Sequence, residues 1–370
     1  MDAQNMFSWI NTASFIRNRF VRTYEDTELY TQEFLTVVDA LFEGHYSKAK
    51  RAFKKSPDFI DFKTKEEDYE KLPVKHIAVC ATMSAGKSTF INALLGKNVL
   101  PARNEATTAK ITSIFNKDDA KHIIGFVQTN TSDATDFCGN VTLKTMDAWN
   151  DRSDVSHIFL QGNLDGITNK TFIIAVHDTP GTNNSKDTSH YDTTMRFLQE
   201  NQMDALIFIA NATQLCTNDE RILLSEVLKQ ILVPRNMRII FVLNKSDLFD
   251  PEKEDIVQIL NNYRSYLYEI GFANPLIFPV SAKAARFFKT AKNRLVEQLT
   301  AREEREFSSF FENFNKLHDF STGTQSNIAT SETIKIAEKE YPLAQIHTAL
   351  ERSGLPQVEH YIGNLFSKER

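Results

Sequence analysis

Four short polar motifs, each placed at the end of an apolar run, constrain the fold of this chain more than any other feature. The run HIAVC precedes ATMSAGKS, TFIIAVHD leads into TPG, RIIFVLN leads into KSD, and LIFPV precedes SAK. The runs ALIFIAN and VTLKTM are likewise interpreted as strands. Short apolar runs that alternate with helical segments predict an α/β fold with a mostly parallel central sheet flanked by helices. Because the carboxyl ends of parallel strands share one edge of a sheet, we expect the four motifs to meet there.

The first motif has the order and context of a phosphate-binding loop, or P-loop. Backbone N–H groups at the turn and at the N-terminus of the helix TFINALLG can bind phosphate oxygens. The Lys87 ammonium can reach the β and γ oxygens, and the Ser88 hydroxyl can ligate Mg²⁺. Ala81 replaces the usual first glycine, and its β-carbon restricts the turn. The nucleotide-binding residues expected here are Met83, Ser84, Ala85, Gly86, Lys87, Ser88 and Thr89.

The second motif, DTPG, predicts contacts with the metal ion and the γ-phosphate. Asp178 can hold Mg²⁺ through water, and the Gly181 N–H can meet the γ-phosphate. Upstream, ATTAKIT offers a threonine hydroxyl as a further metal ligand that senses the γ-phosphate. We favour Thr108 because it directly precedes the run toward the next strand, and Thr107 stays open as the alternative. The expected Mg²⁺ ligands are therefore Ser88, Thr108 and Asp178.

The third motif, NKSD, selects the base. The Asp247 carboxylate can accept hydrogen bonds from guanine N1–H and from the exocyclic amine, whereas adenine offers no such pair of donors. A buried carboxylate left unpaired by the wrong base carries a large penalty, so GTP is favoured over ATP. The aliphatic stem of Lys245 can lie against one face of the guanine, and Asn244 can tie this loop to the phosphate loop.

The fourth motif completes the base site. Ser281, Ala282 and Lys283 follow the strand-like run LIFPV. They can supply a backbone N–H for guanine O6 and a second aliphatic stem for the other face of the base. Four motifs in this order, each at the end of an expected strand, predict a guanine nucleotide site with GTP as substrate, GDP as product and Mg²⁺ as cofactor.

Charge and hydropathy restrict the partners of the protein. The formal net charge is -5 and the pI is about 6.0, which argues against bulk attraction to nucleic acid. No stretch approaches the roughly 18 apolar residues that span a bilayer, so any membrane contact is expected to be peripheral. The N-terminus, MDAQNMFSWI, lacks the pattern of a secretory signal. We expect a cytoplasmic protein, with membrane contact only at the cytoplasmic face.

Helical periodicity divides the rest of the chain. Residues 1–72 contain one glycine and predict an α-helical arm or neck, and residues 73–290 carry the motifs. Residues 291–344 are expected to be a helical excursion, and residues 345–370 a C-terminal helix that packs back on the motif-bearing domain or on the neck. This last helix is entered through Pro356 in its first turn.

One helical stripe in the excursion is unusually aromatic. Its apolar residues are Phe307, Phe310, Phe311, Phe314 and Leu317. A stripe at this spacing more often packs in a core than faces a partner or a membrane, so burial is the favoured interpretation. Display on the surface stays the alternative.

The combination of motifs resembles a known family. MSAGKSTFINALLGKNVLP, ATTAKIT, DTPG, LNKSD, PVSAKAA and SGLPQVEHYIGNLF together are similar to the GTPase domain of bacterial dynamin-like proteins. The resemblance covers residues 72–290 and 345–370 and implies a P-loop GTPase domain that hydrolyses GTP to GDP and phosphate. The interval from Thr108 to Asp178 exceeds the need of a minimal GTPase domain and matches the enlarged sheet of that family.

The same resemblance implies a catalytic arrangement. Small Ras-like GTPases orient the attacking water with a glutamine shortly after the DxxG aspartate, but here Gly181 is followed by TNN. Dynamin-like enzymes use a phosphate-loop serine instead, and Ser84 holds that position beside Met83. In the family the arrangement is completed when two GTPase domains face each other, so the resemblance implies a homodimer. Ser84, Lys87 and Thr108 are the expected catalytic residues.

Two functions fit these expectations. In the first, GTP hydrolysis stimulated by dimerisation acts on a membrane. In the second, the chain is a GTP-gated switch or scaffold that binds a protein partner without membrane remodelling. Full dynamin-like proteins continue into a long stalk and a lipid-binding tip, for which this chain has no length left. The chain is therefore expected to be a fragment, a reduced family member, or one that needs a second dynamin-like chain.

Overall fold

The central feature of the fold is one large mixed sheet. The computed structural model describes residues 72–82, 84–101, 110–118, 120, 122–130, 136–169, 171–181, 188–321 and 330–366. The expected helical arm 1–72 therefore lies, apart from Leu72, outside the described residues. Within the described part, the sheet has nine strands in the order β4-β3-β5-β2-β6-β1-β7-β8-β9.

The strands of this sheet fall into two groups. The strands are β1 (Val74–Ala81), β2 (Ile111–Asn116), β3 (Ile124–Thr129), β4 (Asp136–Cys138), β5 (Val155–Gly162), β6 (Ile173–Asp178), β7 (Ala205–Asn211), β8 (Arg238–Asn244) and β9 (Ile277–Val280). Strands β6, β1, β7, β8 and β9 are mutually parallel neighbours. Strand β2 pairs antiparallel with β6, and β5, β3 and β4 extend the sheet beyond it. The mostly parallel sheet expected from the sequence is confirmed.

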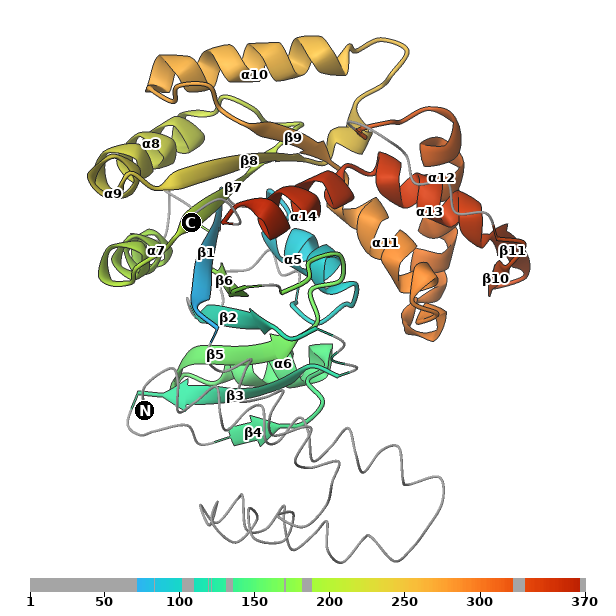
Figure 1. Cartoon of the computed structure of the whole chain (residues 1–370), viewed down its shortest axis with the longest axis horizontal. Coiled ribbons are helices and arrows are strands. Elements are labelled where there is room, and N and C mark those ends of the chain that lie inside the picture. The colour runs from blue at the N-terminus through green and yellow to red at the C-terminus, as the bar shows by residue number, and fades with distance from the viewer. Residues whose placement is uncertain are drawn as a thin grey trace, which may run out of the picture.

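Helices cover both faces of the sheet (Figure 1). They are α5 (Lys87–Leu95), α6 (Leu143–Asp151), α7 (Thr188–Glu200), α8 (Asn218–Val227), α9 (Val233–Arg235), α10 (Ile256–Ile270), α11 (Ala282–Lys292), α12 (Ala301–Lys316), α13 (Leu343–Arg352) and α14 (Leu355–Asn364). A π-helical turn (Leu228–Leu232) joins α8 to α9, and 3-10 turns span Ser246–Leu248 and Val296–Gln298. Helices α5, α6 and α11–α14 pack on one face, and α7, α8 and α10 pack on the other.

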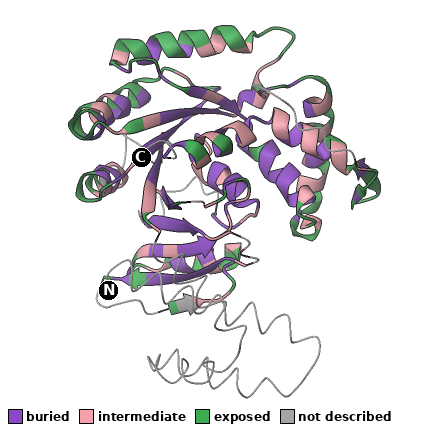
Figure 2. Cartoon of the chain, viewed as in Figure 1, coloured by how far each residue is buried: buried purple, intermediate pink, exposed green. Residues whose placement is uncertain are grey.

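The central strands are buried on both faces, as parallel sheets between helices require. Every residue of β7, ALIFIAN, is buried, and so are the last five residues of β8, IFVLN. Figure 2 shows this burial along the middle of the sheet and the exposed outer faces of α8 and α10. The sheet edge that carries the four motifs is thus built on deeply buried strands.

Two sequence-based expectations about local structure were wrong. The run VTLKTM, interpreted as strand-like, instead begins α6, because the Thr142 hydroxyl accepts a hydrogen bond from the N–H of Thr145 and Thr145 caps in return. The excursion 291–344 is not helical throughout. It ends in an antiparallel hairpin of β10 (Thr333–Ile336) and β11 (Lys339–Pro342).

The phenylalanine stripe of α12 is buried. Phe307 and Phe314 are fully buried, and both pack edge-on against Phe288 of α11. Phe307 also contacts Tyr341 of β11, which closes the hairpin over the helix. Only Leu317, at the end of the stripe, is more than half exposed among the stripe residues. The favoured interpretation of this stripe as core therefore agrees with the structure.

The C-terminal segment forms two helices that return to the sheet. Helix α14 begins with a proline in its first turn, after Gly354 in the left-handed conformation. Its buried residues include Val358 and Ile362, which join the core cluster shared with α5 and β1. Phe366, just beyond α14, packs edge-on against Phe172 at the start of β6. In the described part of the chain, no helix has both the length and the apolar character needed to cross a bilayer.

Candidate functional site

The four motifs converge at the carboxyl ends of four of the five parallel strands. ATMSAGKS follows β1, DTPG follows β6, NKSD follows β8 and SAK follows β9. These strands are neighbours in the order β6-β1-β7-β8-β9, so all four loops leave the same edge of the sheet. The arrangement expected from the sequence is therefore present as a spatial cluster.

The phosphate loop owes its shape to Gly86. This residue has φ +88°, and a Cβ placed on it would lie 2.4 Å from the Asn244 side-chain nitrogen. Any side chain at this position would therefore strain the backbone and displace Asn244. Ser84 also has a positive φ, 59°, and its side chain is exposed. Ala81 is the last residue of β1 and is not among the residues with positive φ, so its β-carbon fits the strand end.

Helix α5 presents free donors at its N-terminus. No side chain caps it, and its first turn has no acidic residue. By contrast, the side chains of Thr217, Asp255, Ser281 and Thr300 cap α8, α10, α11 and α12. The uncapped N–H groups and the positive end of the helix dipole suit a bound anion. Lys87, Ser88 and Thr89, all half-buried, occupy this first turn.

A cation and a carboxylate meet next to these donors. The Lys87 ammonium contacts the Asp178 carboxylate, and both side chains are mostly buried, with exposed fractions of 11% and 14%. Thr179 fixes the end of β6, because its hydroxyl and its N–H both donate to the Val79 carbonyl of β1. Asp178 is therefore held beside the phosphate loop by the register of the sheet.

The residues at this point fit a magnesium ion. Mg²⁺ prefers hard oxygen ligands and binds through one or two protein groups together with phosphate oxygens. The Ser88 hydroxyl, on the second residue of α5, and the Asp178 carboxylate, at the end of β6, provide such a donor set. The third expected ligand, Thr108, and its alternative Thr107 lie outside the described residues, as does Met83.

Asn244 joins three of the four motifs. Its side-chain amide donates to the Ala85 carbonyl at 2.8 Å, and its side-chain oxygen accepts from the Ala282 N–H at 3.0 Å. Since Asn244 is buried, these bonds fix the spacing between the phosphate loop and the loop after β9. The tie between NKSD and the phosphate loop proposed from the sequence is present.

The two charged residues of NKSD lie on a strained turn. Lys245 has φ 65° and precedes the 3-10 turn Ser246–Leu248. Its Cε lies 4.0 Å from the position of a Cβ on Gly86, so its stem runs close to the phosphate loop. Burial raises the pKa of Asp247, opposed by a hydrogen bond with the Ser281 side chain and by the positive charge of Lys283. A partly desolvated carboxylate favours binding of N–H donors.

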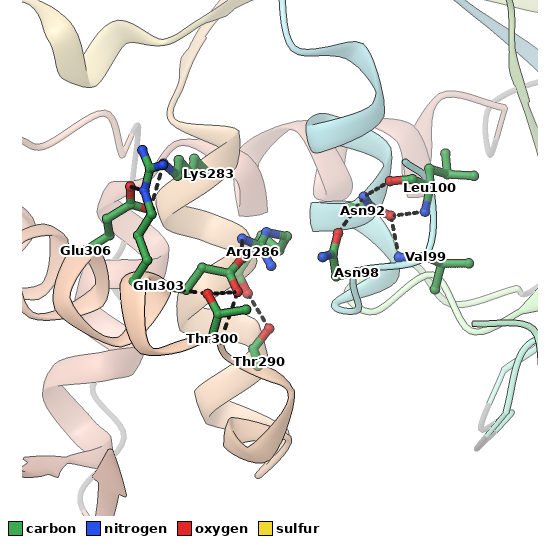
Figure 3. A network of polar contacts seen from close by, with 11 residues as sticks. Asn92, Asn98, Val99, Leu100, Lys283, Arg286, Thr290, Thr300, Glu303 and Glu306 are labelled. Carbon is green, nitrogen blue, oxygen red and sulfur yellow. Dashed lines mark hydrogen bonds and ion pairs between the residues drawn. The ribbon is translucent and has the colours of Figure 1, made fainter. Parts of the chain in front are cut away.

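A residue from the C-terminal part of the chain holds the loop after β9 in place. The Ser281 N–H donates to the Ser353 carbonyl at 2.9 Å, and the Ser281 hydroxyl caps α11. The Ala282 N–H is engaged by Asn244, so a base oxygen bound there would share that donor. The Lys283 ammonium pairs with Glu306 of α12 at 2.8 Å (Figure 3).

Gly181, the last residue of the DTPG motif, is half-buried at the end of its described stretch.

Sequence reasoning missed the supporting residues. Thr179 stands inside the DTPG motif, where its polar side chain after a buried strand could have been recognised as a link to the neighbouring strand. Ser353 and Glu306 gave no such signal, because each acts on a loop more than 20 residues away along the chain. Only the tertiary structure brings them to the site.

Comparisons with known proteins show what this chain is similar to. Residues 77–246 match the model of the dynamin family. An uncharacterized protein in the xynA 3′ region of Caldicellulosiruptor sp. is 29% identical over 224 residues, which are 59% of this chain and 51% of that protein. A bacterial dynamin-like protein of Nostoc punctiforme is 25% identical over 215 residues, 54% of this chain and 29% of that protein. The chain thus spans about half the length of the first relative and less than a third of the second.

A solved structure of an oligomerised bacterial dynamin pair, described as a mechanism for long-range sensing and tethering of membranes, is 18% identical. The alignment covers 75% of this chain and 48% of that chain, with a TM-score of 0.45. The family match spans the phosphate loop, DTPG and the start of NKSD, and these motifs lie together at one sheet edge. This part of the chain is therefore similar to the dynamin family.

Proposed function

We propose that this chain binds GTP and Mg²⁺ at the carboxyl edge of the sheet and hydrolyses GTP to GDP and phosphate. The observation that carries the proposal is the bridge by Asn244, which ties the phosphate loop to the base loops in one buried hydrogen-bond network. A site that reads only phosphates would not need this connection. The dynamin family match supports the same activity.

Each motif residue has a role in this proposal. The N–H groups of the phosphate loop and the Lys87 ammonium bind the β and γ phosphate oxygens, and the Gly181 N–H meets the γ-phosphate. Ser88, Asp178 and Thr108 would hold Mg²⁺, which neutralises phosphate charge when bound. Asp247 accepts from guanine N1–H and the exocyclic amine, while the stems of Lys245 and Lys283 cover the two faces of the base.

Two finer proposals concern assembly. Hydrolysis is stimulated when two GTPase domains face each other, with Ser84 organising the reacting groups. The exposed side chain of Ser84 and the positive φ of its backbone support this role, because strained residues concentrate at functional sites. The assembly acts at a membrane surface, where the chain binds peripherally or with a second dynamin-like chain.

Base selectivity tests the nucleotide site. Asp247→Asn replaces an acceptor by a group that also donates, which suits the xanthine carbonyl in place of the guanine amine. We expect the variant to lose at least about 100-fold in GDP affinity and to gain affinity for xanthosine diphosphate. Titration calorimetry with both nucleotides measures this exchange. Lys87→Ala, which removes the phosphate-binding cation, serves as the control that weakens both. An unaltered preference for GDP would refute the assigned base pairing.

Vesicle flotation separates membrane action from a switch function. The membrane proposal predicts that the chain floats with anionic vesicles in the presence of a non-hydrolysable GTP analogue and less so with GDP. The same experiment with Lys87→Ala shows whether the binding depends on nucleotide. Absence of lipid binding in every nucleotide state would favour the GTP-gated switch or scaffold that binds a protein partner.

A further inference from the structure

A ladder of two ion pairs joins α11 to α12. The Lys283 ammonium lies 2.8 Å from the Glu306 carboxylate, and Arg286 lies 2.6 Å from Glu303. The two steps are one helical turn apart on each helix and run in opposite directions along the chain. Figure 3 shows the two acidic side chains of α12 turned toward the basic side chains of α11. The Lys283–Glu306 pair contains a residue of the proposed base site, Lys283.

The Arg286–Glu303 pair fixes α11 and α12 relative to each other. The Arg286 side chain is only 8% exposed, so its pair with Glu303 is largely desolvated. Glu303 also accepts from the N–H and the hydroxyl of Thr300, which makes it part of the capping box of α12. A carboxylate held by three donors has little freedom to reorient.

The backbone beneath Glu306 is equally rigid. The next residue, Phe307, is fully buried against Phe288 and Tyr341. Glu306 therefore projects from a fixed point on the core, at the start of the buried stripe of α12. Arg302 approaches the second side of the carboxylate at 3.2 Å, one helical turn earlier. Burial would raise the pKa of Glu306, but the Lys283 and Arg302 charges outweigh it and lower that pKa.

Lys283, by contrast, is intrinsically mobile. Its side chain is 45% exposed, and a lysine has four rotatable bonds that cost free energy to order. The described interactions that restrain it are the ion pair with Glu306, the approach of its ammonium to the Phe287 ring at 6.0 Å and the charge of Asp247. A stem that must lie flat against a base benefits from a fixed end.

We propose that Glu306 is a positioning residue of the base site: it holds the Lys283 ammonium so that the aliphatic stem already stands where the guanine will stack. This inference rests on the proposed nucleotide function and extends it to α12, outside the four motifs and outside the family match. Glu306 itself does not touch the nucleotide. Its effect on binding passes through Lys283.

The expected size of the effect follows from the exposure of the pair. Half-exposed ion pairs contribute modestly, so loss of Glu306 should weaken GDP binding by about two- to fivefold. Removal of a negative charge near a polyanion acts in the opposite direction, by general attraction of the phosphates. A charge-matched control is therefore required, and Glu304, two residues earlier on α12, provides it.

The test is a double-variant cycle read by GDP affinity in calorimetry. Glu306→Gln should weaken GDP binding about two- to fivefold in the otherwise natural chain and leave it unchanged in the Lys283→Ala background. Glu304→Gln should not weaken binding. An equal effect of Glu306→Gln in both backgrounds would show a general structural role and overturn the inference, as would unchanged or tighter binding. Failure of the natural chain to bind GDP would instead reject the nucleotide function itself.

Discussion

Glu220 of α8 is a buried carboxyl for which the described part of the chain provides no cationic partner. Its side chain has an exposed fraction of 0%, and one oxygen accepts from the Tyr263 hydroxyl at 2.9 Å. The other oxygen has no hydrogen-bond partner among the described residues. Burial raises the pKa of Glu220 to about 7, against an ordinary value of 4.5, and the hydrogen bond from Tyr263 opposes this only in part. Near neutral pH, folding therefore takes up a proton at this site.

The pH dependence of stability should reveal this group. A raised pKa means that the folded chain binds the proton more tightly, so the stability is greatest below about pH 4.5 and falls as the pH rises toward 7. Glu220→Gln removes this dependence. Relative to Glu220→Gln, the free energy of unfolding of the natural chain should fall by up to about 3 kcal/mol between pH 5 and pH 8. Urea unfolding at both pH values measures the shift, and an identical difference at both would contradict it.

At the nucleotide site, the sequence predicts the residues whose chemistry is local. The order of Gly86 and Lys87 in the phosphate loop, and of Asn244 and Asp247 after β8, can be recognised because each group lies next to the strand end that places it. The residues that hold these groups in place cannot be recognised in this way. Glu306 is one of many glutamates in a charged helix, and only tertiary packing sets it against Lys283.

At the scale of elements, the loop after α5 is organised by one side chain. Asn92 is 1% exposed, and its oxygen accepts from the N–H groups of Val99 and Leu100 at 2.9 and 2.8 Å. Its amide donates to the Leu100 carbonyl at 2.7 Å and to the Asn98 side chain at 3.2 Å (Figure 3). One helical residue thus satisfies three backbone groups of a loop that leaves the phosphate-binding helix.

Replacement of Asn92 should be costly for that reason. Asn92→Ala leaves two buried N–H groups and one carbonyl without their partner, so we expect a loss of about 2 to 4 kcal/mol in the free energy of unfolding. Chemical denaturation followed by circular dichroism measures it. Asn98→Ala is the matched control, because Asn98 is half-buried and meets Asn92 through a single side-chain bond. Equal losses in the two variants would exclude the assigned role.

Strands that are buried on both faces were predictable, because each appears in the sequence as a continuous apolar run. Strands β7 and β8 each contain an uninterrupted apolar run, and both were expected from the sequence. The run VTLKTM was misassigned because threonine, although β-branched, is also a favourable N-cap residue, and the Thr142 side chain caps α6. The hairpin β10–β11 is short and half exposed, with Ile334, Ile336 and Tyr341 as its buried positions. Alternation over four residues is too brief to be distinguished from a loop.

For the whole molecule, the role proposed for Ser84 would link hydrolysis to assembly. The proposed dimer face includes this exposed residue at the sheet edge, so its hydroxyl would act in a site completed by a second copy. Ser84→Ala and Ser84→Gly both remove the hydroxyl, and glycine also accommodates the positive φ without strain. We expect both variants to lower kcat by about 100-fold and to leave GDP affinity nearly unchanged.

Phosphate release and solution mass together check this prediction. The natural chain should form a dimer in the presence of GDP and a transition-state analogue of the γ-phosphate, and its kcat should rise with protein concentration. The Ser84→Gly variant separates the loss of the hydroxyl from backbone strain. An unchanged kcat would remove Ser84 from the mechanism, and a monomer under all conditions would argue against stimulation by self-association.

The contact between Ser281 and Ser353 has a practical consequence for anyone who wishes to isolate the catalytic portion. The turn that contains Ser353 reaches back across the molecule, and a Cβ on the adjacent Gly354 would lie 2.0 Å from the Pro279 carbonyl. A shortened version that stopped after β9 and α11 would keep all four motifs, yet it would leave the Ser281 N–H without its acceptor and uncover the strand beside it. We therefore expect the smallest independently folding unit that carries the four motifs to extend through α14, whose residues pack in the core.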